Sequence, residues 1–353
     1  MNPGTVLRTI VGPRPRKMNV IGSSSALVVL GVSAFLLLPT LSRFQVDLFT
    51  TLLLYVAAAT AWNIIGGFAG QFSLANSAFI GAGGFVTVMI LRNLHWGVIP
   101  TLLVAAAGGG ILAVIMGGIL FRLREAYFVI GSMAVALAAF TWMINWDFTE
   151  AATGISAPIA VIPRREELYV MALIIAVIAL GSAIATFHSV FGLRLMAVRD
   201  DEDVADGLGL SPFRLKLAAV TISGVLTAAV GAVISLQQIT IEPYSSFSLN
   251  WSILFIIMAI VGGLGSVWGP PIGAVVIYYG FTVQLKEFPT LSLLIEGILL
   301  VVLMKLLPGG IVGGLTALRG RFLEYRRAPS GPQGARVPLG RLSPVVPRPT
   351  NPD

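Results

Sequence analysis

The sequence predicts an all-α fold, a polytopic bundle of transmembrane helices, and three observations lead to this class. Of the 353 residues, 56% are hydrophobic and only 11% are charged. The apolar residues form runs close to the ~20 residues that a helix needs to cross a bilayer. These runs recur from Ser23 to Leu307, and most of the Lys and Arg residues fall between them. Such a composition argues against a soluble globular protein.

Charged residues, Pro and Gly delimit the runs and give about ten expected spans, within a range of eight to ten. The two short runs at 251–263 and 269–283 have the lengths of half-helices or tilted helices. We therefore expect broken or re-entrant helices within the bundle. The expected spans lie near residues 20–40, 47–65, 76–91, 98–121, 126–145, 168–187, 214–237, 251–263, 269–283 and 290–307.

The distribution of basic residues predicts the orientation of the spans. With the N-terminus inside, 18 of the 23 Lys and Arg residues fall on the cytoplasmic side and 5 on the external side. Basic residues collect in cytoplasmic loops, so both termini are expected in the cytoplasm. The net charge of +7 then follows from topology and requires no nucleic-acid partner.

Three regions are expected along the chain. Residues 1–18 form a basic cytoplasmic N-terminal arm, and residues 19–315 form the transmembrane domain. The first apolar run is longer than the core of a secretory signal, which favours a retained span over a cleaved signal. Residues 316–353 are rich in Pro, Arg and Gly, so we expect a disordered cytoplasmic tail that is free to contact anionic lipid.

Several kinds of chemistry find no support in the sequence. There is no Cys, and the two His residues, His95 and His188, lie far apart, so neither a disulfide nor a metal centre is expected. No G-x-x-x-x-G-K-[ST] loop for nucleotide phosphates occurs, and no catalytic constellation is found. We expect no enzyme activity, no cofactor and no metal, and an energy source in another subunit or in an ion gradient.

Glycines interrupt two of the apolar runs in a similar way. "IIGGFAG" covers residues 64–70 and "AIVGGLGSVWGPPIGA" covers residues 259–274. Each glycine lowers helix stability by roughly 1 kcal/mol, which predicts a break in both runs. One interpretation is packing, because small residues let transmembrane helices approach closely. In the second run, this hinge or packing role falls to Gly262, Gly263, Gly265 and Gly269.

Polar side chains accompany the first break and favour a second interpretation. A buried amide or hydroxyl without a partner costs a few kcal/mol. Irregular backbone at membrane depth is tolerated only where protein buries it or where it lines a water-filled path. This segment is therefore predicted to line a translocation path. The candidate path residues are Gly66, Gly67, Gly70, Gln71, Ser73 and Asn76.

The loop 191–213 carries a dense cluster of charge. Its acidic run suits the start of a short helix, where carboxylates cap free N–H groups and oppose the helix dipole favourably. Gly207 or Gly209 can end that helix, and Val204 and Leu208, four residues apart, form a small apolar face. The loop is either an ordinary solvated connection or a helix that docks on a soluble partner. The candidate docking residues are Arg199, Asp200, Asp201, Glu202, Asp203, Ala205 and Gly209.

An ion-coupled secondary transporter or channel is the alternative from another class, since ionisable residues inside spans mark ion routes. Only Glu296, in "LSLLIEGILLVV", lies well inside an apolar run. A single acid suits either a structural hydrogen bond to a neighbouring span or a direct role in transport. So few ionisable residues inside the spans favour a transport path whose energy comes from a subunit outside the membrane.

Five fragments follow one another along the chain: "GGFAGQFSLANSAFIGAGGF", "RLREAYFVIGSMA", "GLRLMAVRDDEDVADGLGLSPFRLKLAAV", "MAIVGGLGSVWGPPIGA" and "LLPGGIVG". In these fragments and their order, this chain resembles the LivM-type membrane permease subunits of branched-chain amino-acid ABC importers. The resemblance covers about Leu48 to Leu315.

The resemblance implies a multi-pass permease in the bacterial inner membrane, in contact with membrane lipid. Its partners would be a second homologous permease subunit in a heterodimer, two cytoplasmic ATP-binding subunits and a periplasmic substrate-binding protein. The substrate would be an aliphatic, branched-chain amino acid, moved by alternating access; related permeases carry urea, short amides or other amino acids. The binding protein would dock on external segments such as 145–167 and 238–248.

The resemblance also extends to the charged loop. It is similar to the EAA-type coupling helix, and Glu202, Ala205 and Gly209 match the acid, the small residue and the glycine of that motif. The loop departs from the motif by reading Glu-Asp-Val-Ala instead of Glu-x-Ala-Ala.

Overall fold

Helices account for most of the structure, a computed structural model that describes residues 20–123, 125–283, 298 and 309–314. The α-helices in the described residues are α2 (Val20–Leu37), α3 (Arg43–Asn63), α4 (Asn76–Asn93), α5 (Val98–Leu120), α6 (Glu125–Ile144), α7 (Arg165–His188), α8 (Val190–Asp200), α9 (Glu202–Gly207), α10 (Pro212–Gln238), α11 (Pro243–Ser246), α12 (Leu249–Gly262) and α13 (Gly269–Ile277). Two π-helical segments, Ile64–Phe68 and Tyr278–Val283, continue α3 and α13. The N-terminal arm, the expected span at 290–307 with Glu296, and the C-terminal tail lie outside the described residues.

The predicted all-α class is confirmed. Each of the other nine expected spans corresponds to a helix whose ends differ from the prediction by only a few residues. Within the described residues, seven helical stretches are long and apolar enough to cross a membrane. Neither α4, with its glycines and polar residues, nor the short α13 is among the seven. The number of crossings and the side of the termini therefore stay predictions.

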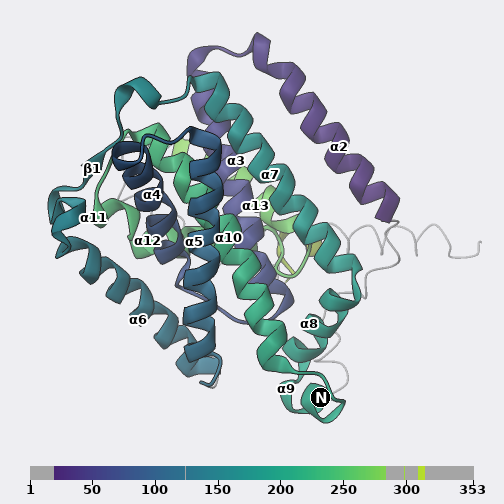
Figure 1. Cartoon of the computed structure of the whole chain (residues 1–353). Helices are drawn as coiled ribbons and strands as arrows, with labels where there is room; N and C mark the ends of the chain where they lie inside the picture. Colours follow the sequence, from purple (N-terminus) through teal and green to yellow (C-terminus); the bar gives the residue numbers. More distant parts are fainter. Residues whose placement is uncertain (1–19, 124, 284–297, 299–308, 315–353) are drawn as a thin grey trace, which may run out of the picture. The chain divides into compact units, whose positions relative to one another are not determined.

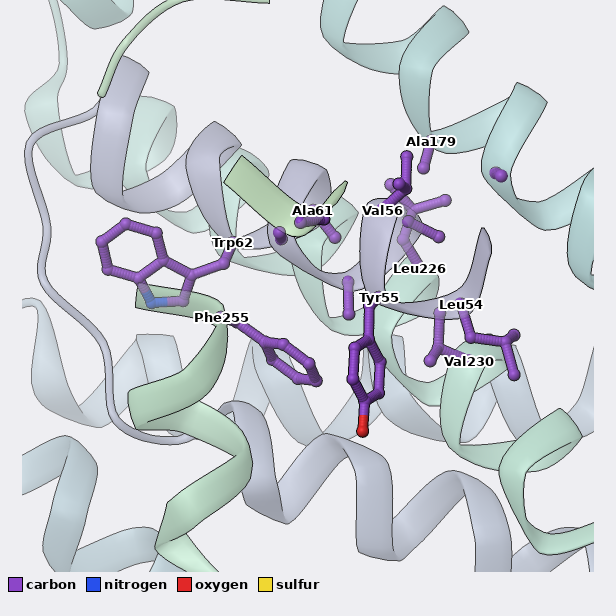
Figure 2. Packing of buried hydrophobic residues seen from close by; sticks show 14 of the residues in the cluster. Leu54, Tyr55, Val56, Ala61, Trp62, Ala179, Leu226, Val230 and Phe255 are labelled. Carbon is purple, nitrogen blue, oxygen red and sulfur yellow. The ribbon is translucent and has the colours of Figure 1, made fainter. Parts of the chain in front are cut away.

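The centre of the bundle is formed by α3 and α10. Helix α10 packs against α3, α4, α5 and α7, while α3 also contacts α12 and α13. Figure 2 shows the side chains that fill the space between them. The labelled residues are Leu54, Tyr55, Val56, Ala61 and Trp62 of α3, Ala179 of α7, Leu226 and Val230 of α10, and Phe255 of α12.

Small residues set the close approach of α4 and α5 to α10, as the packing interpretation of glycine requires. A Cβ atom at Gly83 of α4 would overlap the carbonyl of Ala228 on α10, and one at Gly231 of α10 would overlap the carbonyl of Ile80 on α4. A Cβ at Gly109 of α5 would meet the methyl of the same Ala228. The backbones of the three helices therefore lie in direct contact.

Helix α2 lies along α7 at the edge of the bundle (Figure 1). Two polar contacts fix it: Ser23 Oγ and His188 Nε2 are 3.3 Å apart at one end, and the Tyr169 hydroxyl donates to the Ala34 carbonyl at 2.9 Å near the other. Only 6% of the residues in its apolar stretch are buried within the described protein. Most of α2 is thus available to face lipid.

A two-stranded antiparallel ladder joins the two loops that were expected on the external side. Strand β1 (Ile155–Ser156) pairs with β2 (Thr240–Ile241), and the Ala157 amide donates to the Ile239 carbonyl at 2.8 Å. Strands of two residues are too short for a periodic pattern, so the sequence did not predict them. Because α9 precedes α10 and β2 follows it, the ladder and α9 lie at opposite ends of α10.

Candidate functional site

The predicted break after α3 is present in the structure. The helix widens into the π-helical segment Ile64–Phe68, residues 69–75 leave the helix, and Asn76 begins α4. Single π-turns inside helices occur frequently at functional sites. Gly70 turns the chain with φ +72°, a left-handed conformation that favours glycine. All six candidate path residues lie in this break or at its edges.

Side chains from three helices bind the irregular backbone of the break. Trp62 Nε1 of α3 donates to the Ser73 carbonyl at 2.9 Å. Ser132 Oγ of α6 accepts the Leu74 amide at 2.9 Å, and Ser252 Oγ of α12 donates to the Leu74 carbonyl at 2.7 Å. These bonds supply the partners that a broken helix needs within a membrane.

The three polar side chains expected on the path differ in what they contact. Ser73 Oγ accepts the Ala75 amide at 3.2 Å and so serves the local turn. Asn76 Nδ2 donates to Thr227 Oγ1 of α10 at 3.2 Å. Gln71 is 5% exposed, and its amide group has no hydrogen-bond partner within the described part of the chain. Gln71 thus has an amide group whose hydrogen-bonding capacity is entirely unused within the described residues.

Three buried oxygen atoms near the break have no hydrogen-bond partner among the described residues: Asn76 Oδ1, Ser223 Oγ and Thr60 Oγ1. Ser223 lies one helical turn from Thr227, the partner of Asn76, on the same face of α10. A buried polar atom without a partner is costly, and each case in a folded protein needs an explanation. The unpaired atoms mark this face of α10 as a place where a further polar group would be stabilised.

The two glycine breaks lie against each other, which the sequence did not predict. Asn63, the last residue of α3, is fully buried and bridges them. Its Nδ2 donates to the Ser266 carbonyl and its Oδ1 accepts the Gly265 amide, both at 2.9 Å. A Cβ at Gly67 would lie 2.7 Å from the Gly265 nitrogen. An Asn in the last turn of an apolar run is a signal that would have identified this residue, because a buried amide requires partners.

The glycines of the second break form a tight connection between α12 and α13. A Cβ at Gly262 would overlap the Gly269 carbonyl, and Gly263 and Gly265 have φ values of +131° and +72°. Ser266 Oγ donates to the Gly263 carbonyl at 2.7 Å and accepts the Gly269 amide at 2.9 Å. This geometry supports the predicted packing role, while a hinge movement stays a prediction.

Arg199 reaches the breaks from outside them. It lies near the end of α8, and its Nη1 donates to the Gly67 carbonyl at 3.0 Å. Its Nε and Nη2 donate to Oδ1 of Asp200 at 3.1 and 3.0 Å. Arg199 is one of the candidate docking residues of the charged loop, and in the structure its guanidinium points at the glycine junction. Its docking role stays a prediction.

The short helix expected in the charged loop is α9, and its capping is confirmed. Asp201 Oδ1 accepts the Val204 amide at 3.0 Å, and Gly209, with φ +80°, follows the last turn. The prediction that Asp200 also starts this helix is wrong, because Asp200 is the last residue of α8. The chain bends at Asp201, so the first acid pairs with Arg199 and only the following acids reach the new helix end.

The side chains of α9 divide between internal contacts and solvent. Glu202 forms a 2.5 Å ion pair with Lys216 of α10, whose side chain is 6% exposed. Ala205 is buried, whereas Val204 and Leu208 are 58% and 76% exposed. Asp203 is exposed as well. The apolar face predicted from the four-residue spacing is therefore exposed rather than packed against the described helices.

These features define a class of protein. The chain is a multi-pass helical membrane protein in which the break after α3 lies against the break between α12 and α13, and Arg199 of the α8–α9 loop contacts this junction. No group of His, Asp and Glu able to hold a metal occurs among the described residues, and Lys216 is the only charged residue that is buried there.

Comparison with known proteins identifies the family. Residues 45–304 match the family described as branched-chain amino acid transport system / permease component, and this chain belongs to that family. The match contains both glycine breaks and the α8–α9 loop.

Two similar proteins are known from Salmonella typhimurium and Escherichia coli. Each is named as the high-affinity branched-chain amino acid transport system permease protein LivM. Each is 25% identical to this chain over 309 residues, which cover 77% of this chain and 70% of the relative. No solved structure matches this chain.

Proposed function

We propose that this chain is the permease subunit of an ATP-driven importer that carries branched-chain, aliphatic amino acids across the bacterial inner membrane by alternating access. The family match over residues 45–304 carries this proposal. The names of the two relatives support the substrate class. The absence of a nucleotide-binding loop from the sequence supports ATP hydrolysis by separate subunits.

The substrate path in this proposal runs along the first break. The free amide of Gln71 and the unpaired Oδ1 of Asn76 offer hydrogen bonds to the ammonium and carboxylate groups of a passing amino acid. Ser223 and Thr60 add hydroxyl groups that have no partner among the described residues. None of these groups is charged, so binding along the path is weak, which suits an importer whose binding protein supplies the affinity.

Three kinds of partner complete the proposed assembly: a second homologous permease, two cytoplasmic ATP-binding subunits and a periplasmic substrate-binding protein. The exposed Val204 and Leu208 of α9 suit an apolar contact with an ATP-binding subunit. At the other end of α10, the β1–β2 ladder joins the segments 145–167 and 238–248 into one surface, which suits docking of the binding protein.

The experiment is uptake of labelled leucine by vesicles that contain the complete complex, with Gln71→Leu as the test variant. The change removes the amide and leaves an apolar side chain that is one bond shorter. We expect uptake to fall about tenfold or more, as loss of polar contacts to a charged ligand predicts, while assembly and ATPase activity persist. Gln237→Leu is the matched control, because it removes an amide from the far end of α10.

Three outcomes would contradict parts of the proposal. Unchanged uptake by Gln71→Leu and by matching changes at Ser73 and Asn76 would remove the path and leave the glycines as packing alone. Transport of urea or a short amide without transport of leucine would replace the substrate class. Uptake that needs no ATP and stops with an ionophore would establish an ion-coupled transporter instead.

A further inference from the structure

Arg199 is the point at which the charged loop touches both glycine breaks. Its guanidinium donates to the carbonyl of Gly67 in the π-helical segment. A Cβ at Gly70 would lie 2.5 Å from Arg199 Cγ, and a Cβ at Gly265 would lie 3.1 Å from Arg199 Nη1. One glycine from each break, by having no side chain, thus provides the space that the Arg199 side chain occupies.

The guanidinium is held from both sides. Asp200 accepts two of its N–H groups through one carboxylate oxygen, while the third contact goes to the Gly67 carbonyl. A guanidinium has donors in a fixed planar arrangement, so a bond to Asp200 fixes the direction of the bond to Gly67. The Arg199 side chain is 29% exposed and that of Asp200 is 56% exposed, which places the pair at the edge of the junction.

The helix that carries Arg199 leads directly into the exposed end of the loop. Only Asp201, where the chain bends, separates α8 from α9. Any displacement of α8 and α9 as a unit must therefore shift Arg199. Because Gly67 and Gly265 are linked through Asn63, a shift of Arg199 acts on both breaks together.

We propose that Arg199 is a positioning residue that transmits movement of α8 and α9 to the joined glycine breaks, and that it is not a docking residue for an ATP-binding subunit. This inference rests on the proposed ATP-driven import, because in that proposal the ATP-binding subunits are what moves α9. The side chain needs no contact with substrate or nucleotide for this role. It needs the hydrogen bond from its Nη1 to the Gly67 carbonyl.

The test uses the complete complex in lipid nanodiscs and vesicles with the variant Arg199→Met. Methionine keeps an unbranched stem over Gly70 and removes every donor. Arg199→Lys keeps the charge and one donor group. The matched control is Arg194→Met, because Arg194 lies on the same helix, is exposed, and forms no hydrogen bond to the junction within the described residues.

Two measurements separate transmission from docking. Amide hydrogen exchange of residues 64–71 and 263–269 reports on the junction itself and does not depend on transport. We expect exchange about tenfold faster in Arg199→Met, as loss of one charge-assisted hydrogen bond predicts, with wild-type exchange in Arg194→Met. We also expect leucine uptake about tenfold lower in Arg199→Met at unchanged recovery of the ATP-binding subunits and continued ATPase activity, with partial recovery in Arg199→Lys.

The outcomes divide cleanly. Unchanged exchange in both segments, or wild-type uptake by Arg199→Met, overturns the proposal. Loss of the ATP-binding subunits from the Arg199→Met complex also overturns it, because that result makes Arg199 a docking residue. If the wild-type complex shows no ATP-driven uptake, the proposed function fails, and faster exchange then still supports Arg199 as the link between α8 and the breaks.

Discussion

Replacing Asn63 with Leu tests whether the two glycine breaks are held together by hydrogen bonds. Leu has the same branching at Cγ as Asn, so the change removes the amide and preserves the shape of the side chain. Two hydrogen bonds of 2.9 Å are lost, one to the Gly265 amide and one to the Ser266 carbonyl. Both backbone groups are half-buried, so their loss of a partner is only partly offset by water.

The magnitude follows from the energy of each hydrogen bond. A net loss of ~0.5–1.5 kcal/mol per bond, together with the cost of two partly buried groups without partners, gives about 2–4 kcal/mol. For a chain of this size, 1 kcal/mol corresponds to roughly 2–3 °C in melting temperature. We therefore expect Asn63→Leu to melt about 5–10 °C below the wild type.

The assay is thermal unfolding of the purified protein in one detergent, followed by intrinsic fluorescence. Asn145→Leu is the matched control, because Asn145 is exposed and its Nδ2 donates one hydrogen bond to the Thr141 carbonyl. That change should lower the melting temperature by no more than about 2 °C. A melting temperature of Asn63→Leu within about 2 °C of the wild type would refute the conclusion that these bonds join the breaks.

Three further predictions concern the ends and the centre of the bundle. In this cysteine-free chain, Ser156→Cys should react with an impermeant thiol reagent from outside and Ser211→Cys only after the membrane is opened; external labelling of the second would invert the topology. Glu202→Gln should destabilise the protein by about 1–2 kcal/mol, because the Lys216 ammonium stays buried without its carboxylate partner, while water still reaches the side chain at position 202. An unchanged melting temperature would show that this ion pair makes no net contribution to stability. Gly83→Val should cost about 2–3 kcal/mol by forcing α4 away from a carbonyl of α10, and recovery of folded protein at the wild-type level would contradict the close contact.

The helices were predictable because the signal for a span is local. Runs of apolar residues bounded by charge, Pro or Gly gave the ends of α7 and α10 to within about three residues. The breaks were predictable for the same reason, since Gly-Gly pairs weaken a helix wherever they occur. The form of the first break, a π-helical segment followed by an irregular turn, depends on Trp62, Ser132 and Ser252, which come from three different helices.

The parts of the site that were not predicted depend on contacts between distant residues. Asn63 and Ser266 are 203 residues apart, and Arg199 and Gly67 are 132 residues apart. No periodicity encodes such pairs, because each follows from how α3, α8 and α12 pack. The same reason explains why the ion pair of Glu202, a candidate docking residue, with Lys216 was not predicted.

The peripheral position of α2 has a consequence for biogenesis. The matched region begins at residue 45, after α2, and α2 packs mainly on α7, which begins at Arg165. At a synthesis rate of ~5–20 residues per second, the ribosome completes α7 about 10–30 s after α2 has left it. During that interval α2 lacks the helix that is its main partner among the described residues, so it must be stable in the bilayer without that partner. A chain that starts after α2 should therefore still insert and assemble its remaining helices.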